Sequence, residues 1–284
     1  MSTTIHDVVN KLVTRGYVQV PFEVHRIPEE LISTASDTMA SFIRQSRQFD
    51  ERFTITRRGE SEPDMLLVHR GAAEGKDHKS FVHYSHDIPT TLQKEILGRV
   101  PTWVSLQTLE TELNRFIESV CFVLEARYPS LFGASLVPLF RNSVTRSIPY
   151  STTTLRGVFY PPSLEQKGAK AHFDRSFLTA HLGDQGGNLY AHHALQRGSS
   201  VSVSPRTGEI LLFWGVKAFI LSRGRVVPLF HSASTLQYRE RRALVCFNHV
   251  TVGKKVIDAR THYDETCRRL RLDPLDVYAQ AYDL

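Results

Sequence analysis

Two histidines and one aspartate are the residues of this sequence whose types and spacing best suit metal chemistry. His172 and Asp174 are two residues apart in the segment AHFDRSFLT, and His231 follows 57 residues after Asp174 in PLFHSAS. In a β-strand, residues two apart point to the same face, so His172 and Asp174 can project together into a barrel. A second histidine from a later strand would complete two neutral imidazoles and one carboxylate. Such a set leaves about three positions of an octahedral iron open for a co-substrate and oxygen.

This set is the facial triad of non-haem Fe(II) oxygenases, and two neighbouring features favour it over a chance His-x-Asp. Arg241 lies ten residues after His231, at the start of the run RRALVCF. A guanidinium there can bind a ligand carboxylate through two parallel hydrogen bonds. Tyr160, in the run LRGVFYPP, offers a phenol on the strand that precedes the metal ligands.

The second half of the chain predicts the strands that would position these side chains. Short apolar runs recur there, and prolines and glycines separate them. Eight short runs at such spacing indicate an antiparallel sandwich or jelly roll rather than a parallel α/β sheet. The eight runs are 155–160, 176–182, 187–193, 199–204, 209–214, 218–222, 226–230 and 242–250.

The first half predicts mainly helices. Apolar residues at i, i+3, i+4, i+7 and i+8 predict a helix from Ile5 that ends at Gly16. The run 16–22 predicts a short strand, a helix opens at Pro28, and an apolar stripe predicts the strongest helix over 106–127.

We therefore expect one compact domain, 1–284, that is mainly β with flanking helices. Its centre would be a double-stranded β-helix, the jelly roll of cupin-like proteins. The expected parts are a helical N-terminal region with short strands (1–141), a jelly-roll catalytic core (142–250) and C-terminal helices (251–284).

Composition narrows the class of protein. Of 284 residues, 41% are apolar and 23% are charged, which suffices for a sizeable core. The 35 Lys and Arg exceed the 29 Asp and Glu without a long basic run, which favours tolerance of anionic ligands over nucleic-acid binding. Three cysteines without C-x-x-C spacing argue against a disulfide framework or a structural zinc site. With neither a signal-peptide pattern nor a long apolar run, a cytoplasmic protein is expected.

Four segments together resemble the isopenicillin N synthase-like branch of the 2-oxoglutarate- and Fe(II)-dependent dioxygenases. AHFDRSFLT is similar to the family's His-x-Asp segment, TGEILLFWG to its strand-then-Gly turn, LSRGRVVPLFHSAS to the approach to its distal histidine, and RRALVCF to its arginine strand. The resemblance implies that His172, Asp174 and His231 bind the iron. It also implies that Arg241 pairs with the distal carboxylate of 2-oxoglutarate and that Tyr160 hydrogen-bonds to it.

The resemblance extends over most of the chain but is incomplete at the arginine. The family usually has Arg-x-Ser, and Ala243 stands at the third position here. A hydroxyl is therefore missing from the implied carboxylate site, so either Tyr160 or another donor replaces it or the co-substrate binds weakly. Arg242 is an alternative anchor in principle, although strand alternation gives it the opposite face from Arg241. The family's spacing favours Arg241. RGYVQVPF and residues 64–90 resemble the N-terminal region that the family uses to help close over the substrate.

The implied activity is an oxygenase that uses Fe(II), 2-oxoglutarate and O2 and releases succinate and CO2, with ascorbate as a candidate reductant. We expect a small-molecule substrate, preferably a carboxylate, that is hydroxylated, desaturated or cyclised, and no nucleic-acid or membrane partner. Arg156 shares a strand face with Tyr160 and could reach an anionic substrate, with a surface salt bridge as an equal alternative. His181, His192, His193 and His249 are expected to be hydrogen-bonded wall residues rather than ligands.

Three other functions remain open. An Fe(II) oxidase of the isopenicillin N synthase type would take all its electrons from the substrate and would use Arg241 on a substrate carboxylate. It would make no succinate. A nucleic-acid dealkylating oxygenase would use a similar triad but would need a basic groove with stacking aromatic side chains. A non-enzymatic jelly-roll binding module would be expected to lack at least one member of the triad.

Overall fold

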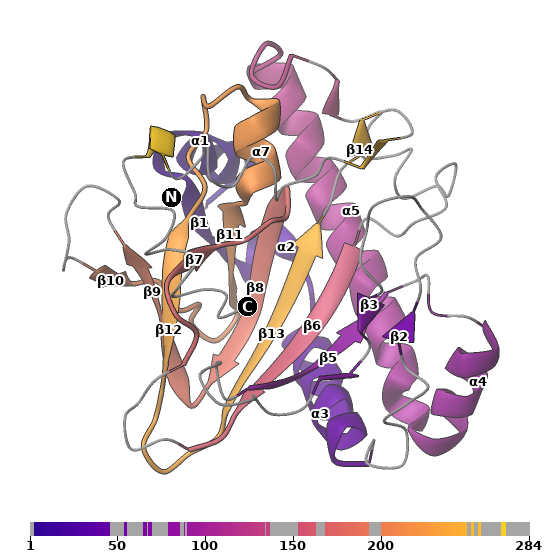
Figure 1. The fold of residues 1–284 in the computed structure, drawn as a ribbon. Coiled ribbons are helices and arrows are strands. Elements are labelled where there is room, and N and C mark those ends of the chain that lie inside the picture. Colours follow the sequence, from indigo (N-terminus) through magenta and orange to yellow (C-terminus); the bar gives the residue numbers. More distant parts are fainter. Residues whose placement is uncertain are drawn as a thin grey trace.

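The computed structural model describes most of the chain in two antiparallel sheets and a set of helices. The described residues are 3–45, 54–55, 65–66, 68–69, 79–85, 88, 90–133, 135–136, 153–162, 168–192, 200–248, 251–252, 255–256 and 268–270. Figure 1 shows β8, β13, β6 and β5 running side by side, with the long helix α5 beside them. The antiparallel, mainly β architecture with flanking helices confirms the expected fold class.

The N-terminal helices begin and end where local chemistry requires. Thr4 and Asp7 form a reciprocal capping box at the start of α1 (Ile5–Arg15), and Gly16 ends it in the left-handed conformation. The structure confirms the helices expected from Ile5, from Pro28 and over 106–127. The helices after α1 are α2 (Phe22–His25), α3 (Glu29–Gln45), α4 (Thr90–Arg99) and α5 (Val104–Arg127), with a 3-10 turn at Pro101–Trp103 before α5. None of the helices in the described part of the chain is long and apolar enough to cross a bilayer.

The larger sheet combines strands from both halves of the sequence. Its seven strands are all paired antiparallel with their neighbours. In spatial order they are β1 (Tyr17–Pro21), β11 (Glu209–Trp214), β8 (Leu178–Gln185), β13 (Arg241–Asn248), β6 (Thr153–Tyr160), β5 (Ser80–Tyr84) and β4 (Val68–His69). The N-terminal region therefore extends this sheet at both edges.

The smaller sheet has four antiparallel strands and carries the candidate ligands His172 and His231. In spatial order they are β10 (Ser200–Ser202), β9 (Gly187–His192), β12 (Phe230–Thr235) and β7 (His172–Phe173). Two further strand pairs are β2 (Thr54–Ile55) with β3 (Met65–Leu66), and β14 (Thr251–Val252) with β15 (Lys255–Val256).

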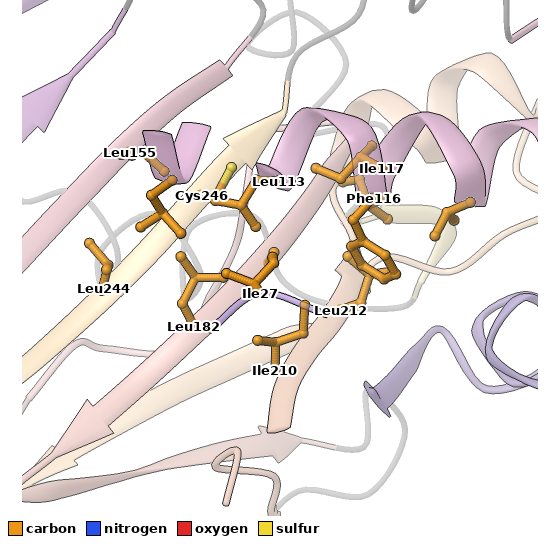
Figure 2. Close-up of a cluster of buried hydrophobic side chains, with 14 of the residues drawn as sticks. Ile27, Leu113, Phe116, Ile117, Leu155, Leu182, Ile210, Leu212, Leu244 and Cys246 are labelled. Carbon is orange, nitrogen blue, oxygen red and sulfur yellow. The ribbon is translucent and has the colours of Figure 1, made fainter. Parts of the chain in front are cut away.

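Alternation along the strands separates two buried clusters, one on each face of the larger sheet. Figure 2 shows α5 packed over the first: Leu113, Phe116 and Ile117 of the helix lie across from Leu155, Leu182, Leu244 and Cys246 of the strands. The second cluster lies between the two sheets, and it is built from residues such as Val158, Leu189, Leu211, Phe213, Ala233 and Ala243. Burying one such leucine or phenylalanine contributes about 1.5–3 kcal/mol, so both clusters hold the strands in place.

Three expected elements differ in the structure. Of the run 218–222, residues 218–221 belong to a helix, α7 (Val216–Leu221), rather than to a strand. A short, mostly buried apolar run has no periodicity that distinguishes the two. In the run 226–230 only Phe230 is in a strand. The segment expected to hold only C-terminal helices (251–284) opens with the β14–β15 pair, and most of its remainder lies outside the described residues.

Candidate active site

His172, Asp174 and His231 converge at the inner face of the smaller sheet. β7 and β12 pair so that His172 stands directly opposite His231, and the two ring centroids are 4.4 Å apart. Asp174 follows immediately after β7 and places Oδ1 3.6 Å from Nε2 of His172 and 3.9 Å from Nε2 of His231. One ligand atom from each residue lies within 4.8 Å of the others, a grouping that can hold a metal ion.

The hydrogen bonds of both histidines turn the same ring nitrogen toward this point. Nδ1 of His172 is 2.7 Å from the carbonyl oxygen of Lys170, and Nδ1 of His231 is 3.1 Å from that of Leu229. A carbonyl oxygen only accepts, so Nδ1 carries the proton and donates it in each ring. In the neutral ring Nε2 is then the lone-pair nitrogen, and in both residues it is directed at Asp174, as a metal ligand requires.

A short hydroxyl chain orients the carboxylate. Oγ1 of Thr179 donates to Oδ2 of Asp174 at 2.8 Å, and Oγ of Ser176 lies 2.6 Å from the same threonine oxygen. Since Thr179 gives its proton to Asp174, Ser176 must be the donor in the second bond. Oδ2 is thereby engaged, and Oδ1 is the oxygen left facing the two imidazoles.

The electrostatics of Asp174 and His231 favour the protonation states that bind a metal ion. Burial lowers the pKa of His231 to about 4, helped by the nearby His172 and opposed by attraction to Asp174. Burial opposes ionisation of Asp174, but attraction to His231, the proximity of His172 and a hydrogen bond from Thr179 keep the pKa of its carboxyl well below its usual range. At neutral pH the site therefore presents a neutral His231 and an ionised Asp174, which fit a divalent cation such as Fe(II).

Arg241 and Tyr160 meet in the same pocket on the facing sheet. They are directly paired residues of β13 and β6, and the guanidinium carbon lies 5.2 Å from the centre of the phenol ring. Both residues line the pocket that also contains the triad. Arg242 faces the other way and pairs with Glu240 and with Asp37 of α3, as strand alternation predicts.

Arg156 lies in the pocket wall between two aromatic rings. Its guanidinium carbon is 5.0 Å from the ring centre of Phe81 and 4.7 Å from that of Phe247. Its Nε donates to Nε2 of His83 at 2.5 Å. This stacking fixes the plane of the guanidinium, and cation–π attraction stabilises its charge there.

The four other histidines that were expected to be wall residues differ in their position relative to the pocket. His181 lines the pocket, whereas His192 is bonded to Ser232 outside the pocket lining, and His193 and His249 lie outside the described residues. Thr179, which orients Asp174, belongs to the AHFDRSFLT segment but had no role assigned from the sequence, and sequence reasoning missed Asp184, which pairs with Arg241. For Thr179 a local signal existed, because a hydroxyl a few residues after a candidate ligand can bond back to it. For Asp184 the sequence contains no such signal.

Comparisons with known proteins agree with this fold and geometry. Residues 150–250 match the family model of the 2OG-Fe(II) oxygenase superfamily. No curated protein matches the sequence. A dioxygenase for auxin oxidation from Arabidopsis thaliana, AtDAO1, solved with 2-oxoglutarate, is 13% identical with a TM-score of 0.68, over 96% of this chain and 92% of its own.

Two further solved structures show the same fold. A full-length Neurospora crassa protein, solved in complex with alpha-KG, is 14% identical with a TM-score of 0.62, over 92% of this chain and 84% of its own. The rice dioxygenase for auxin oxidation is 15% identical with a TM-score of 0.61, over 98% of this chain and 94% of its own.

Two sheets that enclose a pair of histidines and a carboxylate are the arrangement that non-haem iron oxygenases use. With the family match over residues 150–250, the chain carries in its core strands a domain similar to the 2OG-Fe(II) oxygenase superfamily. It is a dioxygenase, an oxidoreductase, and Fe(II) and 2-oxoglutarate are its cofactors. The isopenicillin N synthase-like branch stays a prediction.

Proposed function

We propose that His172, Asp174 and His231 hold the Fe(II), and that Arg241 and Tyr160 bind the distal carboxylate of 2-oxoglutarate. The observation that carries this proposal is the convergence of three ligand atoms within 4.8 Å, with both histidine Nδ1 atoms turned to backbone carbonyls. When bound, Fe(II) and 2-oxoglutarate supply oxygen activation, coupled to conversion of 2-oxoglutarate into succinate and CO2.

The residues of the chain orient the reactants and exclude water. Arg241 would align the co-substrate from the wall of the larger sheet, opposite the triad. Apolar side chains between them, among them Leu189, Phe213 and Ala233, line the pocket and reduce its water content. The oxidised product is an alcohol, an alkene or a ring, according to which C–H bond of the substrate the pocket wall orients for reaction.

We further propose a small, negatively charged metabolite as the substrate. The residues that line the pocket carry cations at Lys79, Arg156 and Arg241 and an anion at Asp174, and Asp184 pairs with Arg241. The guanidinium of Arg156 is held between two aromatic rings in the wall of this pocket, and in that fixed plane it suits a bidentate bond to a substrate carboxylate.

The assignment of Arg241 is tested by an anaerobic titration of the protein with Fe(II) and then 2-oxoglutarate. The visible charge-transfer band of the chelate reports co-substrate binding. We expect the band in the wild type, a dissociation constant raised at least about tenfold in Arg241→Ala, and no change in Arg242→Ala. Arg242 is the matched control because it is the same residue type on the opposite face of the same strand.

Two results would contradict the proposal. Iron binding without a band for 2-oxoglutarate in the wild type would point to the oxidase alternative, in which Arg241 grips a substrate carboxylate. Failure of iron to bind would remove the triad assignment itself.

The substrate class is tested by succinate formation with matched pairs of small carboxylates and their amides. With carboxylates we expect succinate formation above the rate measured without substrate. We expect Arg156→Gln to reduce the preference for the carboxylate over its matched amide. A panel in which the amides are accepted equally well would refute the anionic substrate.

A further inference from the structure

An irregularity in β8 turns one extra acidic residue toward the pocket. In the pairing of β13 with β8, Leu244 stands opposite Gly183 and Val245 stands opposite His181, so Leu182 is an additional residue in β8. Residues three apart normally point to opposite faces of a sheet, and a bulge reverses that relation beyond it. As a result Leu182 packs into the helix-covered cluster, while His181 and Asp184 both reach the pocket side.

Asp184 engages one complete edge of the Arg241 guanidinium. Nε of Arg241 donates to Oδ1 of Asp184 at 2.8 Å, and Nη2 donates to Oδ2 at 2.5 Å. Both side chains are almost fully buried, with 3% of the arginine and none of the aspartate exposed. Bidentate, charge-assisted pairs of this kind fix the plane and the direction of a guanidinium.

Two neighbours support this arrangement. Nε2 of the buried His181 lies 3.3 Å from Oδ2 of Asp184, a close contact but one without hydrogen-bond geometry. A Cβ at Gly187 would overlap Cδ of Arg241 and approach its Nε to 2.8 Å, so the arginine chain runs along a glycine that leaves it room. Ala243, directly opposite Asp184, has no hydroxyl to offer a ligand.

We propose that Asp184 is a positioning residue for the co-substrate. It holds Arg241 by the Nε–Nη2 edge, so that the remaining edge, with Nη1 and the second hydrogen of Nη2, receives the distal carboxylate of 2-oxoglutarate. A guanidinium has five N–H groups, and two of them go to Asp184, which leaves three for the ligand. This inference rests on the role proposed above for Arg241.

The test compares two 2-oxo acids that share the iron-chelating end. 2-Oxoglutarate carries the distal carboxylate, and 2-oxobutyrate lacks it. Their dissociation constants are measured anaerobically from the charge-transfer band of the Fe(II)-loaded protein, for the wild type and for Asp184→Ala. We expect the wild type to prefer 2-oxoglutarate and Asp184→Ala to lose about tenfold of that preference, with the 2-oxobutyrate constant unchanged.

Two further variants complete the design. Asp184→Asn keeps the shape of the side chain but not its charge, and it is expected to change the preference in the same direction. It replaces Asp184→Ala in the test if thermal melting shows that Asp184→Ala does not fold. Glu240→Ala is the matched control, because Glu240 is the acid paired with the neighbouring Arg242 on the outer face. It should leave both constants unchanged.

Three outcomes would overturn the positioning role. The first is an unchanged preference for 2-oxoglutarate in folded Asp184 variants. The second is an equal loss of affinity for both 2-oxo acids. The third is tighter binding of 2-oxoglutarate in the variants, which would mean that Asp184 competes with it. A wild type that binds 2-oxoglutarate no better than 2-oxobutyrate would instead refute the role of Arg241, and the inference with it.

Discussion

The two faces of the larger sheet use the same three strands for opposite purposes. On the face covered by α5, alternate residues of β6, β8 and β13 are apolar and pack into one cluster (Figure 2). On the pocket face, apolar residues alternate in space with residues that carry charges and hydrogen-bonding groups. The apolar set of the helix face includes Leu155, Leu182, Leu244 and Cys246, and the polar set of the pocket face includes Arg156, Tyr160, His181, Asp184 and Arg241.

The difference between the two faces shows the condition under which this fold can bury ionic groups. Apolar burial on the helix face stabilises the sheet with no requirement on direction. A buried charge, by contrast, costs several kcal/mol unless a partner compensates it in good geometry. The pocket meets that condition pairwise, with Arg241 on Asp184 in the larger sheet and Asp174 beside two histidines at the smaller one. Substitutions on the helix face should therefore change stability, and those on the pocket face should change ligand binding.

The largest effect is expected from Asp174→Ala. Loss of the carboxylate removes one of the three ligand atoms and the negative charge that balances the metal, so Fe(II) affinity should fall more than about a hundredfold. Anaerobic calorimetry measures the affinity, and thermal melting checks the fold. His192→Ala is the control, since this histidine lies outside the pocket lining. An Asp174→Ala protein with wild-type iron affinity would place the metal elsewhere.

Leu113→Ala tests the helix face of the comparison. Leu113 is fully buried in the cluster under α5, and its truncation should cost about 3 kcal/mol of unfolding free energy through lost burial and a residual cavity. Urea titration measures the loss. Val104→Ala, at a 55% exposed position of the same helix, should change stability far less. Iron affinity of the folded Leu113→Ala protein should be unchanged, and a marked decrease would show that the two faces are coupled.

A smaller effect is expected from pH on the metal-free protein. The pKa of His231 is lowered to about 4 in the fold, from 6.5 in the unfolded chain, so the unfolded chain binds the proton first as pH falls. The stabilisation is fully present above pH 6.5 and should decline by about 2 kcal/mol by pH 5. Urea titrations across this range measure the slope. His231→Gln should flatten it, and an equally steep slope in that variant would assign the proton uptake to another group.

Local patterns in the sequence were sufficient for much of this protein. The capping residues of α1, the apolar stripe of α5 and the short runs with turn residues between them depend on neighbours within a few positions. The spacing of His172 and Asp174 likewise predicted that they would lie together, although β7 ends at Phe173 and Asp174 follows it. Alternation also placed Arg241 and Arg242 on opposite faces before the fold was known.

Only the tertiary structure determined those features of the protein that depend on contacts between residues distant in the sequence. The run 218–222 had the composition of a strand, and its packing as the helix α7 has no local signature. Asp184 is three residues from His181, so strict alternation would have put the two on opposite faces. The bulge at Leu182 exists only in the pairing of β8 with β13, and it is this pairing that turns Asp184 toward Arg241. The physical reason is that side-chain direction in a sheet follows register, and register is fixed between strands rather than along one of them.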